Sequence, residues 1–141
     1  MEQTYRVLIV DDDPDDQFLI KIAFEQESEK FILDIASDGN EVLTMIQTPL
    51  FLPDLILLDL NMPFVSGFGV LQYLKESPRH CHIPVIILTT SSQPDDVEQA
   101  YRFGANTFIT KPSSHQELTR LVRHLRVYWF ELATIYTAGI R

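Results

Sequence analysis

Four groups of polar side chains come directly after short aliphatic runs: Asp11, Asp12 and Asp13, then Asp59, then Thr89 and Thr90, and finally Lys111. Carboxylates that gather at one place repel each other and stay ionised only if a cation neutralises them. Mg²⁺ suits such a place, because carboxylates, water and phosphate are its usual ligands. An ionised aspartate can also accept a phosphoryl group, while a lysine and a hydroxyl can stabilise the oxygens gained. These residue types therefore indicate magnesium-assisted phosphoryl transfer to a carboxylate, provided that the fold brings them together.

The elements that would position these residues alternate along the chain. Short apolar runs predict strands over residues 6–10, 32–36, 54–58, 84–88 and 107–110. Several of the runs are apolar throughout, which is typical of strands covered by helices on both faces. The segments between them have helical periodicity, so the pattern predicts an α/β fold with a parallel sheet.

Capping signals place the helices between these strands. Asp13 precedes Pro14 as an N-cap, and Asp38 and Ser114 each stand three residues before a glutamate, the spacing of a capping box. With right-handed crossovers, a (βα)5 chain makes a doubly wound five-stranded parallel sheet in strand order 2-1-3-4-5. Ligands of such sheets bind where the order reverses, here between strands 1 and 3. Asp11, Asp12 and Asp59 are expected to converge there.

Four motifs in this order resemble the receiver domains of two-component response regulators: VLIVDDDPDD, LILLDLNMP, VIILTTS and FITKP. The resemblance covers nearly the whole chain, and it implies a single receiver domain over residues 1–141 with the flavodoxin-like receiver fold. The chain looks most like the small single-domain regulators paired with cyanobacterial phytochromes and their bacterial relatives. The DDDPDD opening, the longer loops at 48–53 and 78–83, and the aromatic tail carry this finer likeness.

The resemblance implies a metal and phosphoacceptor role for four positions. Asp59 matches the phosphoacceptor. Asp12 matches the acid that binds Mg²⁺ directly, and Asp11 matches its neighbour, which usually acts through water. Asn61 matches the position whose backbone carbonyl completes the metal shell.

The resemblance also implies a switch. Thr89 matches the hydroxyl that moves toward the phosphoryl group, and Lys111 matches the lysine that pairs with it. Phe108 falls where receivers carry a switch aromatic, although simple core packing explains a phenylalanine there equally well. The bond between Lys111 and Pro112 matches a peptide that is usually cis.

The function that follows is a phosphorylation switch and not an enzyme in its own right, although it assists its own phosphorylation and dephosphorylation. The resemblance implies a sensor histidine kinase as donor, and output through a downstream protein, a phosphotransfer partner or a change of dimer. A magnesium-dependent phosphohydrolase is disfavoured, because Asn61 stands where such enzymes place a second acid. A phosphate-independent scaffold is disfavoured by the intact set of site residues, and a flavin-binding protein by the acids after strand 1.

Composition excludes other classes. The formal net charge of −9 argues against non-specific binding to nucleic acid, which needs clustered lysine and arginine. No apolar run approaches the ~20 residues that span a bilayer, and the first residues lack the features of a secretory signal. With Cys81 as the single cysteine, the chain is expected in the cytoplasm, without membrane contact.

Three local features remain open. The last helix carries apolar residues on more faces than one domain can cover, which predicts an extended C-terminal helix over 127–141 and a homodimer through this helix and the strand 5 edge. The alternative is a tail that folds back over its own domain. Asp15 and Asp16 are expected in an exposed first helical turn, and Thr90 is expected to narrow access to Asp59.

Overall fold

The computed structural model describes residues 4–25 and 30–137, and its centre is a parallel sheet. The strands are β1 (Tyr5–Val10), β2 (Phe31–Ala36), β3 (Leu55–Leu58), β4 (Val85–Thr89) and β5 (Thr107–Thr110), and they pair in the order β2-β1-β3-β4-β5. The predicted strand order is therefore confirmed. The register aligns Val10 with Leu58, so the residues that follow β1 and β3 leave the sheet side by side.

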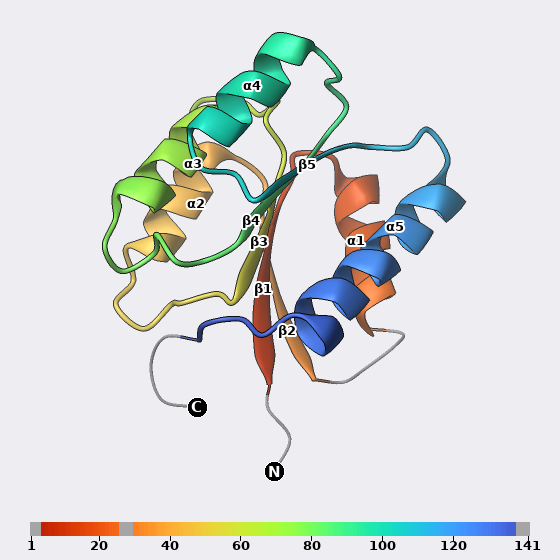
Figure 1. Ribbon diagram of the computed structural model, residues 1–141, viewed down its shortest axis with the longest axis horizontal. Helices are drawn as coiled ribbons and strands as arrows, with labels where there is room; N and C mark the ends of the chain where they lie inside the picture. Colours follow the sequence, from red (N-terminus) through yellow and green to blue (C-terminus); the bar gives the residue numbers. More distant parts are fainter. Residues whose placement is uncertain (1–3, 26–29, 138–141) are drawn as a thin grey trace.

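Five α-helices cover the two faces of this sheet: α1 (Pro14–Glu25), α2 (Gly39–Ile46), α3 (Gly67–Glu76), α4 (Pro94–Arg102) and α5 (His115–Val127). Figure 1 shows α1 and α5 on one face and α2, α3 and α4 on the other. The predicted caps form, because Asp38 accepts the N–H of Glu41 and Ser114 accepts the N–H of Glu117.

Alternating strand residues build the two halves of the core, since successive side chains of a strand point to opposite faces. On the face of α1 and α5, Val7 and Ile9 pack with Phe24 and Val122. On the opposite face, Leu8, Val10 and their neighbours in β3 and β4 pack against α2, α3 and α4. Both faces of the sheet are thus covered, so its polar functional groups lie at the ends of the strands.

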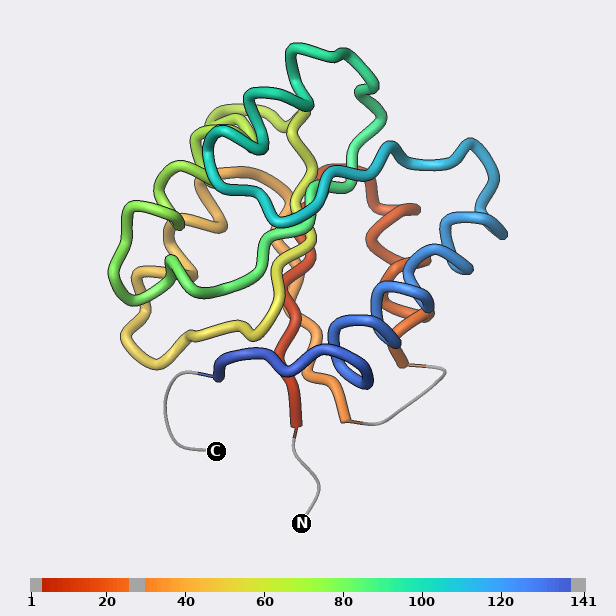
Figure 2. Tube along the Cα trace, viewed as in Figure 1, coloured from red at the N-terminus to blue at the C-terminus, as the bar shows by residue number. Residues whose placement is uncertain are grey.

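The C-terminal segment differs from the expected long helix. α5 continues as one π-helical turn (Tyr128–Leu132), which closes with a bond from the N–H of Ala133 to the carbonyl of Tyr128, and Ala133 is already extended. Residues 133–137 then leave the helix (Figure 2), and the ring of Tyr136 lies 4.7 Å from that of His82. The helix predicted over 127–141 therefore ends at Leu132, and its last four residues lie outside the described part.

Candidate functional site

Three carboxylates meet at the carboxyl edge of the sheet, where the strand order reverses. Asp11 follows β1 and is 2% exposed, while Asp59 follows β3 and is 5% exposed. Asp12 is exposed beside them. One carboxylate oxygen from each of the three lies within 4.8 Å of the others, so the convergence expected from the sequence is found.

Backbone hydrogen bonds fix these acids. The N–H of Asp11 donates to the carbonyl of Ala36, and the N–H of Asp59 donates to the carbonyl of Val10, so the ladder continues one residue past each strand. Asp11 Oδ1 also accepts the N–H of Asp13 at 2.9 Å. The acids are therefore held by the main chain as well as by their side-chain partners.

Lys111, one residue past β5, supplies the positive charge that balances this cluster. Its side chain is 6% exposed, and its Nζ lies 2.7 Å from Asp11 Oδ2, 2.8 Å from Asp16 Oδ2 and 3.4 Å from Asp59 Oδ2. Burial alone would lower the pKa of Lys111, but the hydrogen bonds to Asp11 and Asp16 outweigh it and raise the pKa. The ammonium therefore stays charged at physiological pH.

Burial dominates the ionisation of Asp11. It raises the pKa of this carboxyl to about 6 in the metal-free protein, against the opposing effects of Lys111 and the N–H of Asp13. A buried carboxylate whose charge is costly is well suited to a cation, because a bound cation removes that cost.

The hydroxyl of Thr89 lies beside the acids at the end of β4. Thr89 is fully buried, and its Oγ1 accepts the side-chain N–H of Asn61 at 3.3 Å. The N–H of Asn61 donates in turn to Asp59 Oδ1 at 3.1 Å. Asn61 thus connects the acid of β3 with the hydroxyl of β4, while the N–H of Lys111 donates to the carbonyl of Thr89 at 2.7 Å.

Phe108 lies in β5, the strand that pairs with β4. Its side chain is partly buried against the core of the α2–α4 face. Its N–H donates to the hydroxyl of Tyr101 at 3.0 Å, which joins β5 to the end of α4. The prediction of a cis bond at Pro112 is wrong, because no peptide bond among the described residues is cis.

The donor set fits Mg²⁺. The cluster offers hard oxygen donors from three aspartates, and among the described residues it is the one group of His, Cys, Asp or Glu side chains close enough to hold a metal. Asp12, which is exposed, leaves the cluster open on its outer side. Room for water and phosphate ligands on that side is what Mg²⁺ requires, because it keeps several such ligands in proteins.

Two contributors were not predicted from the sequence. Asp16, expected to be solvated, pairs with Lys111 instead. Gly67, the first residue of α3, lies so close to the end of β3 that a Cβ would come within 2.4 Å of the carbonyl oxygen of Asp59. The glycine therefore lets α3 approach the strand that carries Asp59; the sequence motif NMPFVSG gave no direct signal for this approach.

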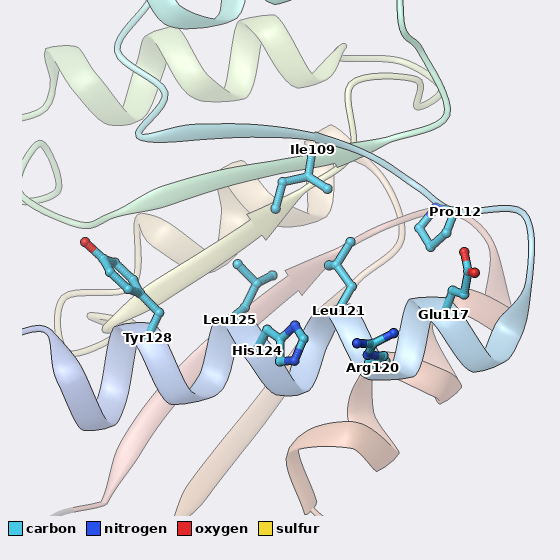
Figure 3. A pocket seen from close by; sticks show the side chains of 8 residues that line it. All are labelled: Ile109, Pro112, Glu117, Arg120, Leu121, His124, Leu125 and Tyr128. Carbon is cyan, nitrogen blue, oxygen red and sulfur yellow. The ribbon is translucent and has the colours of Figure 1, made fainter.

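A second surface lies along α5, away from the acids. A groove of about 560 Å³ runs between β5 and α5, and Figure 3 shows the side chains that line it: Ile109, Pro112, Glu117, Arg120, Leu121, His124, Leu125 and Tyr128. Its walls combine aliphatic side chains with both signs of charge. Tyr128 is 54% exposed at its end.

Comparison with known proteins agrees with this fold. The model of the response regulator receiver domain matches residues 7–123. The chain therefore belongs to the response regulator receiver domain family, whose members accept a phosphoryl group from histidine kinases and bind Mg²⁺ in an acidic pocket.

Its relatives include response regulators of cyanobacterial phytochromes. Response regulator Rcp1 of Synechocystis is 32% identical over 139 residues, 94% of this chain and 93% of that protein. The Mn²⁺-bound structure of Rcp1 superposes with a TM-score of 0.89, at 31% identity over 94% and 99% of the two chains. The phosphorylated cyanobacterial phytochrome response regulator RcpA gives a TM-score of 0.92, at 30% identity over 95% and 99%.

A regulatory protein of another organism is a further relative. A probable methanogenesis regulatory protein, FilR2, of Methanothrix harundinacea is 35% identical over 132 residues, 91% of this chain and 85% of that protein. Within residues 4–25 and 30–137, none of the helices has the length and hydrophobicity of a membrane-spanning segment.

Proposed function

We propose that Asp59 accepts a phosphoryl group from the phosphohistidine of a sensor histidine kinase in the cytoplasm, with Mg²⁺ held by Asp11, Asp12, Asp59 and the carbonyl of Asn61. The observation that supports this most strongly is the position of Asp59. It is buried, it belongs with Asp11 and Asp12 to a cluster that could hold a cation, and its Oδ2 lies 3.4 Å from the ammonium of Lys111. The exposed Asp12 leaves that cluster open to solvent.

The transfer is a substitution at phosphorus. An Asp59 carboxylate oxygen forms a bond to the phosphorus while the N–P bond of the phosphohistidine breaks, and the imidazole leaves with the electron pair. The metal ion supplies charge that offsets the repulsion between anionic nucleophile and anionic donor. Lys111 donates N–H bonds to the oxygens of the transferred group and keeps its proton throughout.

We propose that Thr89 and Phe108 carry the signal from the acyl phosphate to the surface. The Thr89 hydroxyl is buried beside Asn61, and a move toward the phosphoryl oxygens would empty space next to β5. Phe108 packs partly buried in that region. Its inward motion would change the surface formed by α4, β5 and α5, where a downstream protein or a phosphotransfer partner would bind.

The first test is phosphorylation by acetyl phosphate. Incubation with Mg²⁺ is expected to add one phosphoryl group, detected by intact mass. The gain should vanish in the Asp59→Asn variant and in EDTA. A chain that gains no phosphoryl group under any condition, while its circular dichroism shows a folded protein, contradicts the phosphoacceptor role.

We further propose that the chain forms a homodimer through the α5 groove. The ring of Tyr136 contacts His82 of its own domain, which favours a tail that folds back over the domain. Tyr128 and Leu132, however, are 54% and 73% exposed and remain available to a second copy. The groove also carries Glu117 and Arg120 one helical turn apart. If the α5 helices of two copies pack antiparallel, Glu117 of each copy could pair with Arg120 of the other copy. We therefore favour a second copy of the chain as the partner that fills this groove.

The dimer predicts a mass twice that of one chain at micromolar concentration, measured by light scattering after gel filtration. Arg120→Glu should give monomers, because it places like charges opposite each other. The double variant Glu117→Arg, Arg120→Glu should restore the dimer. Lys21→Glu on α1 is the matched control and should leave the mass unchanged. A monomeric mass of the unaltered chain contradicts the proposal.

A further inference from the structure

Lys111 is shared among three carboxylates, and Asp59 is the most distant of them. Its Nζ lies 2.7 Å from Asp11 and 2.8 Å from Asp16, but 3.4 Å from Asp59. Charge-assisted N–H···O bonds are strongest at about 2.7–2.9 Å, so the first two contacts hold the ammonium. A lysine has no further N–H donors once these three acceptors are served. Any new acceptor at Asp59 must therefore displace an existing one.

The contact of Asp16 with Lys111 is not explained by the position of Asp16 in the first turn of α1. Aspartates in a first helical turn are favoured by the helix dipole wherever their side chains point, and Asp15 is an exposed example. The side chain of Asp16 is only 16% exposed, and its Oδ2 faces the buried Lys111. Burying two charges is costly unless they are paired, so this contact is a specific one.

Asp16 also stands outside the metal cluster. The oxygens that could hold a cation come from Asp11, Asp12 and Asp59. A cation bound there would attract the Asp11 carboxylate and weaken its ion pair with Lys111. Asp16 lies outside that cluster, so its ion pair with Lys111 would remain. In the metal-loaded protein, Asp16 is thus the group that opposes a move of Lys111 toward the oxygens of a phosphoryl donor.

We propose that Asp16 is a positioning residue that holds Lys111 on the α1 side of the site and thereby restrains phosphorylation of Asp59. The inference rests on the proposed phosphoacceptor role of Asp59. Two effects act together: the ion pair withholds the ammonium from the donor, and the carboxylate repels the anionic donor itself. Both act when the donor binds, so Asp16 raises the donor concentration that gives half the maximal rate.

The test compares Asp16→Asn with Asp15→Asn in full-length protein containing Mg²⁺. Both variants remove one negative charge from the same helical turn, but only the first removes a partner of Lys111. With acetyl phosphate, an Asp59 oxygen bonds to phosphorus, the P–O bond to acetate breaks and acetate leaves. Asp16→Asn is expected to lower the half-saturating acetyl phosphate concentration about three- to tenfold, the range expected for one charge near the site, and Asp15→Asn less than twofold.

A second variant and a second readout separate positioning from folding. Asp16→Glu keeps the charge and should return the half-saturating concentration toward that of the unaltered chain. The NMR signal of the Lys111 side chain should shift in Asp16→Asn and not in Asp15→Asn. Equal kinetics for the two asparagine variants, or slower phosphorylation of Asp16→Asn, would overturn the inference while leaving Asp59 as phosphoacceptor. No phosphoryl gain in any variant, the unaltered chain included, would overturn both.

Discussion

Asp11 is the most deeply buried of the three acids in the cluster, and its charge destabilises the metal-free protein. Burial raises its pKa to about 6 from an ordinary value of 3.8, so the folded state disfavours the ionised form. The resulting loss in the free energy of unfolding is absent below pH 3.8, grows as the pH rises to about 6, and is complete above that pH. The shift corresponds to about 3 kcal/mol.

Asp11→Asn is therefore expected to stabilise the metal-free protein by about 1–3 kcal/mol at pH 7, although it also loses a partner of Lys111. Urea unfolding in EDTA at several pH values measures the effect, and the gain should shrink as the pH falls from 6 toward 3.8. Asp95→Asn, an exposed acid in the first turn of α4, is the control. A variant that is less stable than the unaltered chain at pH 7 would show that the ion pair outweighs burial.

Thr90 follows the buried Thr89 and is exposed at the end of β4. Its β-branched side chain is expected to narrow the approach to Asp59. Thr90→Ala should speed phosphorylation by acetyl phosphate a few-fold, less than about 1.4 kcal/mol in the barrier. Stopped-flow or quenched mass spectrometry gives the rate, and Ser92→Ala, farther along the same loop, serves as control. An unchanged rate would refute this role.

The acids of the site could be predicted because strand order alone brings Asp11 and Asp59 together. The role of Asp16 could not. Whether a first-turn aspartate faces solvent or Lys111 depends on how α1 is rotated about its axis. That rotation is set by the packing of Ile20, Ala23 and Phe24 against α5 and the sheet, which the local sequence does not specify.

At the scale of elements, the end of α5 shows how one irregular turn changes which side chains are buried. A constant helical period predicts Trp129, Leu132 and Tyr136 on the buried stripe. In the structure Trp129 packs as expected, but so does Phe130, whose ring lies 4.7 Å from Tyr5 and 5.0 Å from Phe31. Leu132 and Tyr136 are instead 73% and 67% exposed. The π-helical turn adds a residue to the turn, so the stripe shifts. Sequence periodicity has no signal for such a turn.

Phe130→Ala should therefore lower the free energy of unfolding by about 2–4 kcal/mol, because it removes a ring from an aromatic cluster that ties α5 to β1 and β2. Leu132→Ala, two residues away and exposed, should change it by less than about 0.5 kcal/mol. Urea unfolding followed by circular dichroism measures both. If the two variants lost equal stability, the stripe expected from regular periodicity would be the better description.

At the scale of the whole molecule, the architecture follows from rules that act over the entire chain. Continuous apolar strands require cover on both faces, and right-handed crossovers leave few possible strand orders. The order β2-β1-β3-β4-β5 then fixes where the acids, the hydroxyl and the lysine meet. The path of the tail does not follow from these rules, because it depends on single contacts such as the one between Tyr136 and His82.

The hydroxyl of Tyr101 has a consequence for how copies of this chain can associate. It occupies the N–H of Phe108 on β5, the last strand of the sheet. An edge strand with free N–H groups can template a strand from another molecule, which is a common route to aggregation. A strand from another copy could therefore bond to the N–H of Phe108 only after the Tyr101 hydroxyl had released it.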